Sequence, residues 1–154
     1  MIRKKIWIVT LVVLTLSCNK DDNTIEETSQ GYNMLLIGNS FFKPYAEKLD
    51  NLVIQAGFEN HSSIRITRGG ENGRPINFWN DSNSNEHLQI KAALDQGNIE
   101  IFGMTAGNEP EDRTEGHRAW INYALQNNPN ISIFIAIPQI DFPADWEERA
   151  QEYG

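Results

Sequence analysis

Apolar runs typical of buried strands alternate with segments of helical period along most of the chain. Parallel strands need a crossover connection of a dozen or more residues, which is usually a helix. Because right-handed crossovers place helices on both faces of such a sheet, the pattern predicts an α/β fold with a three-layer, doubly wound parallel sheet. The strand-like runs cover residues 33–38, 61–67, 98–104 and 131–137, and the helical segments cover residues 44–56, 88–94 and 114–126.

The ends of the predicted helices are marked by residues with known terminal preferences. Pro44 suits the first turn of a helix, and Gly57 and Gly97 suit the position just past the end of one. Thr114 is a plausible N-cap for the helix that follows it.

Trp79 falls in a loop-like stretch, and of Trp79, Trp120 and Trp146 it is the one most expected to be exposed near the carboxyl ends of the strands. The alternative is a core position, which is usual for aromatic residues near helical apolar positions.

Residues 1–17 follow a different pattern, which is typical of an export signal. Basic residues at 3–5 precede an apolar run over residues 6–16, which is too short to span a bilayer as a mature helix. The run ends in Leu-Thr-Leu-Ser-Cys, which resembles the lipobox of bacterial lipoproteins and implies cleavage before Cys18 and acylation of that residue. The alternative is an ordinary secretory signal in which the only cysteine falls there by chance.

The charge of the chain limits the classes of partner that it is expected to bind. There are 13 Lys+Arg against 21 Asp+Glu, a net charge of −8, and removal of residues 1–17 takes away three basic residues, which makes the charge −11. Nucleic acid is therefore an unexpected partner, as is a membrane bound through a basic patch. Residues 18–31 are polar and acidic and predict a disordered tether, so membrane attachment would come from acyl chains on Cys18, in the bacterial envelope and most simply at the outer membrane. The folded domain is then residues 32–154.

Ser40 is the residue whose position best suits chemistry. It follows Gly38 and Asn39 at the predicted carboxyl end of the first strand and precedes a helix. Ligands bind beyond the carboxyl ends of the strands in such sheets, and a nearby glycine-rich turn can supply backbone N–H groups to a developing oxyanion. Ser40 is thus a candidate nucleophile, and the alternative is that it serves only as a helix N-cap.

The sequence LLIGNSFF at residues 35–42 resembles the first block of the SGNH (GDSL-type) hydrolase superfamily in its GNSF form. Gly69 and Gly70, after the second predicted strand, resemble the second block. The resemblance implies a flavodoxin-like fold and hydrolysis of O-acyl esters of carbohydrates or lipids. It also implies that Ser40 forms an acyl-enzyme, and that the N–H groups of Ser40 and Gly70 line an oxyanion hole.

The third block of that family is matched only in part. The family pattern Gly-x-Asn-Asp is represented at best by residues 105–109, in which Gly107 directly precedes Asn108 and no Asp follows. Asn108 is therefore a candidate third oxyanion donor, and the alternative is a turn-forming residue in a polar loop.

The family's fourth block, Asp-x-x-His after a further strand, has no match in residues 142–154. A serine hydroxyl needs a base within hydrogen-bond reach, and Asp141 cannot replace an imidazole at neutral pH. We therefore expect a domain that is truncated after the fourth strand, either the first part of a longer hydrolase or a shortened paralogue, and turnover by this chain alone is in doubt. Three histidines could substitute, although structural or exposed positions are expected for all of them: His61, His87 and His117.

Cofactor chemistry is not indicated by any motif. The glycine-rich stretch at residues 69–74 lacks the Lys-Ser/Thr of a phosphate-binding loop, and no His, Asp or Glu group has metal-ligand spacing, so neither a nucleotide, a metal nor another cofactor is expected. The competing hypothesis to an esterase is a non-catalytic surface lipoprotein. Such a protein would bind a glycan or a partner protein at the same carboxyl ends of the strands.

Overall fold

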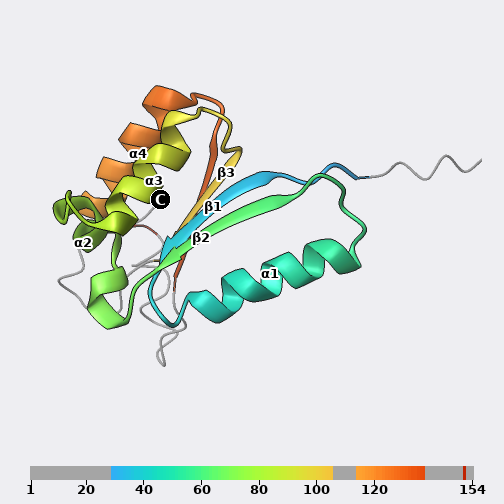
Figure 1. Cartoon of the computed structure of the whole chain (residues 1–154), viewed down its shortest axis with the longest axis horizontal. Helices are drawn as coiled ribbons and strands as arrows, with labels where there is room; N and C mark the ends of the chain where they lie inside the picture. The colour runs from blue at the N-terminus through green and yellow to red at the C-terminus, as the bar shows by residue number, and fades with distance from the viewer. Residues whose placement is uncertain (1–28, 106–113, 138–150, 152–154) are drawn as a thin grey trace, which may run out of the picture.

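The computed structural model describes residues 29–105, 114–137 and 151 (Figure 1). Cys18, Asn108, Asp141 and the helix expected from Pro143 onward lie outside these described residues. The elements, in chain order, are β1 (Asn33–Gly38), α1 (Lys43–Gln55), β2 (Ser62–Thr67), the short 3-10 helix η1 (Gly70–Gly73), α2 (Pro75–Asn80), α3 (Asn85–Asp95), β3 (Ile101–Thr105), α4 (Glu115–Asn127) and β4 (Ser132–Ala136).

The four strands form one parallel sheet in the order β2-β1-β3-β4. Ile37 of β1 is paired with Ile66 of β2 on one side and with Met104 of β3 on the other. The chain leaves β1 toward β2 and then crosses back over β1 to continue through β3 and β4. The predicted α/β class with a parallel sheet is therefore confirmed, and the direction of winding reverses between β1 and β3, where ligands bind in open sheets of this kind.

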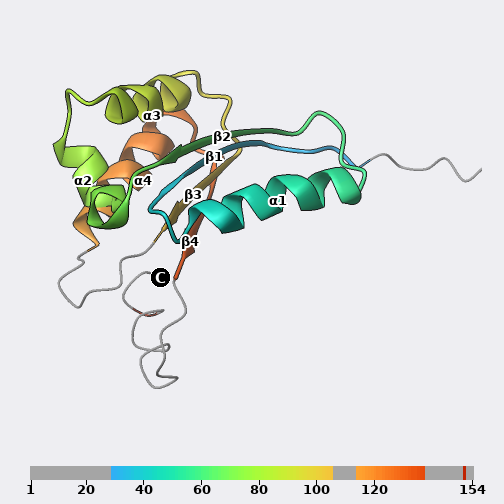
Figure 2. The ribbon, with the colours of Figure 1, turned by 60° about the horizontal axis from the view of Figure 1, so that its bottom comes forward.

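Helices cover both faces of the sheet. Figures 1 and 2 show α1 on one face and α2, α3 and α4 on the other. Successive residues of β1 point to opposite faces, so Leu35 and Ile37 join the larger apolar cluster under α2–α4, while Met34 and Leu36 join the smaller cluster under α1. All four side chains are buried, which explains why β1 is apolar without alternation.

The predicted helix ends are confirmed at two glycines and at one N-cap position. Gly57 has φ +71° and Gly97 has φ +68°, the left-handed conformation that glycine adopts most easily after a helix. Thr114 holds the N-cap position of α4, but its side chain makes no capping hydrogen bond. A side-chain cap is found instead before α3, where the Ser84 hydroxyl accepts the N–H of His87 at 3.1 Å.

Two expectations about burial and secondary structure are wrong. The apolar pattern of residues 131–137 predicts a buried strand, yet β4 is only half-buried, because within the described part of the chain it pairs on one side, with β3. Trp79 lies in the helix α2 rather than in a loop. This helix has only six residues, which is too few for a helical period to show in the sequence.

The described segment begins with residues attached to the amino end of the sheet. The N–H of Gly31 donates to the carbonyl of Glu59 at 2.6 Å, and the N–H of Glu59 donates to the carbonyl of Ser29 at 3.0 Å. Residues 29–31, which the sequence places in the tether, are thus paired with the chain that leads into β2. None of the helices in the described ranges is long and apolar enough to cross a membrane.

Candidate functional site

The turn between β1 and α1 is organised by Asn39. Its side chain is buried, and its Oδ1 accepts the N–H groups of Phe41 and Phe42, each at 3.1 Å. Its carbonyl oxygen accepts the N–H groups of Phe42 and Lys43, also at 3.1 Å each. Asn39 therefore holds the turn that leads into α1. The N-cap residue of the helix is Phe42, so the alternative role of Ser40 as the N-cap is wrong. Ser40 is exposed on this turn, at the carboxyl end of β1.

The glycine-rich turn after β2 contacts this same segment. The N–H of Arg68 donates to the carbonyl of Gly38 at 3.1 Å. Gly73, at the end of η1, is buried, and a Cβ atom placed on it would lie 2.5 Å from the Cα of Asn39. Gly70, the first residue of η1, is exposed with φ +54°. The structure thus brings the two predicted site residues Ser40 and Gly70 onto adjoining turns, whereas the third, Asn108, lies outside the described residues.

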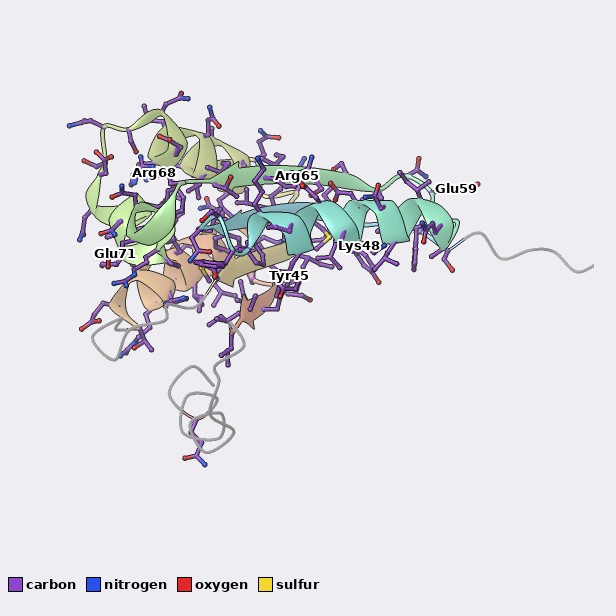
Figure 3. All side chains as sticks on the ribbon, turned by 90° about the horizontal axis from the view of Figure 1, so that it is seen from below. Tyr45, Lys48, Glu59, Arg65, Arg68 and Glu71 are labelled. Carbon is purple, nitrogen blue, oxygen red and sulfur yellow. The ribbon has the colours of Figure 1, made fainter. Side chains whose placement is uncertain are left out.

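Arg68 holds the start of the glycine-rich turn in place. Its guanidinium Nη2 lies 2.9 Å from Oε2 of Glu86 and 3.0 Å from Oδ2 of Asp81, and its Cζ lies 5.0 Å from the centre of the Phe78 ring. The hydrogen bond with Glu86 is the main cause that raises the pKa of Arg68, and the same bond lowers the pKa of Glu86. Figure 3 shows Arg68 and Glu71 at the end of the molecule opposite Glu59. Arg68 could not be identified from the sequence, because its partners follow it by more than ten positions and only the fold brings them together.

We expect Glu86→Gln to lower the free energy of unfolding near neutral pH, and the difference from wild type to shrink in acid. The folded-state pKa of Glu86 lies below its ordinary value of 4.5, so its contribution is fully present above that value and is lost as the pH falls through the lower folded value. Urea unfolding of both proteins at several pH values measures this. Glu47→Gln, on the exposed surface of α1, is the control, and a Glu86→Gln deficit that stayed constant from neutral pH to about pH 3 would contradict the assignment.

The three histidines occupy different parts of the fold. His61 precedes β2 at the amino end of the sheet, where its Nδ1 accepts the N–H of Tyr32 at 3.3 Å and its Nε2 lies 3.9 Å from Oδ1 of Asp50. His87 is buried with its Nδ1 2.8 Å from the carbonyl oxygen of Phe78. These two histidines have the structural positions that the sequence predicts, and neither lies on the Ser40 turn.

His117 is the histidine at the carboxyl end of the sheet. It lies in the first turns of α4 and is buried, and its Nε2 is 2.8 Å from the carbonyl oxygen of Thr105, the last residue of β3. This end of β3 adjoins the carboxyl end of β1, because the two strands are paired in the sheet. The predicted structural position is confirmed by its burial, and the fold also places it at the same end of the sheet as Ser40.

Two apolar side chains next to Ser40 were not identified from the sequence. Phe41 is 66% exposed, although phenylalanine is usually buried, and Tyr45 is 67% exposed. Phe41 lies in the turn that precedes α1, and Tyr45 lies in the first turn of that helix. Tyr45 is visible on α1 in Figure 3. The expectation that Trp79 lies exposed near the carboxyl ends of the strands is wrong, since its ring packs 4.8 Å from that of Trp120.

Within the residues that the structure describes, no group of three or more His, Cys, Asp or Glu side chains could hold a metal ion. Comparison of the chain with models of protein families, with curated proteins and with solved structures finds no match. The chemistry of the site therefore has to be argued from its own residues.

Proposed function

We propose that the chain is a serine esterase-like hydrolase of the SGNH type, which acts on O-acyl esters of carbohydrates or lipids. The observation that carries the proposal is the position of Ser40, exposed on a turn that Asn39 holds with four backbone contacts and that Gly73 packs against. A nucleophile held on rigid backbone is pre-oriented for attack, which lowers the entropic part of the barrier.

In the proposed reaction, a general base takes the proton of the Ser40 hydroxyl as its oxygen attacks the ester carbonyl, and the same proton passes to the leaving alkoxide, so that the alcohol departs and an acyl-enzyme forms. Water then hydrolyses the acyl-enzyme to the free acid and Ser40. The family supplies this base from its Asp-x-x-His block, which has no match in residues 142–154. The oxyanion would be stabilised by the N–H groups of Ser40 and Gly70, with Asn108 as a third donor. Each donor in a formed hole contributes roughly 3–4 kcal/mol to transition-state stabilisation. Positive φ at Gly70 supports its part, because it gives the glycine-rich turn a backbone conformation that other residues adopt at a cost.

The proposed location is the bacterial envelope, with the domain attached to the outer membrane through acyl chains on Cys18. The support is the pattern of residues 1–18 together with the acidic charge, which disfavours attachment through a basic surface. Neither metal nor cofactor is needed for the proposed chemistry, since hydroxyl, backbone N–H groups and a base suffice.

The proposal is tested by labelling the full chain with a fluorophosphonate probe and by assaying p-nitrophenyl acetate. We expect covalent labelling on Ser40, shown by peptide mass spectrometry, and its complete loss in Ser40→Ala. Ser82→Ala is the matched control, because Ser82 is also an exposed serine in a turn. Equal labelling of Ser40→Ala, or a folded wild type that takes no label, would refute the serine hydrolase proposal.

A second function from another class is a non-catalytic lipoprotein that binds glycans with the same surface. The observation that favours it is the exposure of Phe41 and Tyr45 beside Ser40, since aromatic side chains stack on sugar rings without any need for a base. Glycan binding that persists in Ser40→Ala, together with no hydrolysis by wild type, would favour this function over the first.

A further inference from the structure

Gly73 is the glycine of the η1 turn with the tightest surroundings. A Cβ atom at this position would lie 2.5 Å from the Cα of Asn39, 2.6 Å from the carbonyl oxygen of Gly38 and 2.7 Å from the carbonyl oxygen of Arg68. All three are backbone atoms, so no side-chain rotation can relieve the contact. Real Cβ atoms essentially never come so close to other atoms, and any side chain at residue 73 must therefore move one of the two backbones.

The other two glycines of the turn differ from Gly73 in the reason for their presence. Gly69 has φ −73° and nothing within 4 Å of a Cβ atom, so neither conformation nor space requires a glycine there. Gly70 has open space around it but φ +54°, so its requirement is conformational. Gly73 is absent from the residues with positive φ, and its requirement is its close approach to the backbones of Gly38, Asn39 and Arg68.

The contact of Gly73 is one of two points at which the glycine-rich turn is attached to the segment that carries Ser40. At the other point, the N–H of Arg68 donates to the carbonyl of Gly38 at 3.1 Å. The two attachments reach adjoining backbone positions, Gly38 and Asn39, and residue Ser40 comes next. Residues 69–72, which include Gly70, are therefore held between two fixed points on the segment that carries Ser40.

We propose that Gly73 is a positioning residue, whose missing side chain sets the distance between the Gly70 amide and Ser40. This inference rests on the proposed function, because the close approach matters for catalysis only if the Gly70 amide stabilises an oxyanion. Gly73 touches neither substrate nor reacting atoms, and it acts through the backbone of η1. A displacement of about 1 Å in such a constellation can reduce a rate about 100-fold.

The test compares Gly73→Ala with Gly69→Ala in the full chain. We expect Gly73→Ala to slow fluorophosphonate labelling of Ser40 about 100-fold and to lower kcat for p-nitrophenyl acetate with KM nearly unchanged, because a displaced oxyanion donor affects the transition state more than the ground state. Gly69→Ala should label at the wild-type rate. Thermal unfolding of each variant separates loss of position from loss of fold.

A second variant covers the case in which Gly73→Ala does not fold. One glycine inserted between Gly70 and Glu71 keeps the packing of Gly73 and the hydrogen bonds that the Glu71 carbonyl accepts from the N–H of Arg74 and the side chain of Asn77, at 2.9 Å and 2.6 Å. The inserted residue lets the Gly70 amide move independently of the Gly73 contact, so we expect the same loss of labelling in a folded protein. Wild-type labelling rates in the insertion variant, or in folded Gly73→Ala, would overturn the positioning role while the nucleophile proposal stands. No labelling of folded wild type would overturn both.

Discussion

Replacing Trp120 with alanine should lower the free energy of unfolding by about 3–5 kcal/mol, the range measured for removal of large aromatic side chains from cores. Trp120 is fully buried on α4 and is the largest side chain in the core. Its ring packs edge-on against Trp79 of α2 at 4.8 Å and lies 5.3 Å from the ring of His87 of α3. The substitution therefore opens a cavity where three helices meet.

Urea unfolding followed by circular dichroism measures this effect. The Trp120→Phe variant separates the contribution of ring packing from that of the indole hydrogen bond. The indole N–H of Trp120 donates to the carbonyl oxygen of Pro75 at 3.0 Å, and phenylalanine would keep an aromatic ring but lose that bond. An unsatisfied buried carbonyl costs about 1–3 kcal/mol, so Trp120→Phe should fall between wild type and Trp120→Ala. A loss below about 1 kcal/mol in Trp120→Ala would show that the packing at this junction is wrongly described.

The second large effect is expected from Gly116→Ala. Alanine favours a helix over glycine by about 1 kcal/mol, so on propensity alone this change in α4 should stabilise the protein. A Cβ atom here, however, would collide with the backbone nitrogen and Cα of Ile76 in α2. Overpacking of this kind costs typically 1–3 kcal/mol or more, and contact with backbone places it at the upper end, so we expect a net loss of about 2 kcal/mol.

The measurement for Gly116→Ala is again the free energy of unfolding in urea. Asn122→Ala, at an exposed position of the same helix, is the control and should change stability by less than about 0.5 kcal/mol. A stabilised Gly116→Ala protein would mean that α2 and α4 are farther apart than in the structure. The sign of the change thus decides between helix propensity and close packing.

The parts of the fold that could be predicted from the sequence are those with a local cause. Residues 33–38 are apolar throughout because the strand is covered on both faces, and Gly57 and Gly97 mark helix ends because their backbones have positive φ. The partial exposure of β4 could not be predicted, because central and edge strands have the same apolar pattern until their neighbours are known. The helix α2 was missed because six residues carry too little periodicity.

The candidate site also has features that could be predicted from local sequence and features that could not. Ser40 could be placed at the end of a strand from its neighbours alone, and the spacing of Asn39 to Phe41 and Phe42 is a local turn pattern that the sequence does contain. The ion pairs of Arg68 and the close approach of Gly73 to Asn39 depend on segments that are distant in sequence. Such contacts have no local signature, because they exist only once the sheet is assembled.

The pairing of residues 29–31 with Glu59 fixes the point at which the predicted tether joins the domain. This attachment is at the amino end of the sheet, while the Ser40 turn follows the carboxyl end of β1. A strand of six residues separates the two ends by about 20 Å, and the residues between Cys18 and Ser29 reach at most about 40 Å when extended. If the chain is held at Cys18, a predicted tether of this length exceeds the length of the strand, so the Ser40 turn would be free to face either the bilayer or the surroundings. The proposed hydrolase would then have access both to esters of the membrane that holds it and to acylated glycans around it.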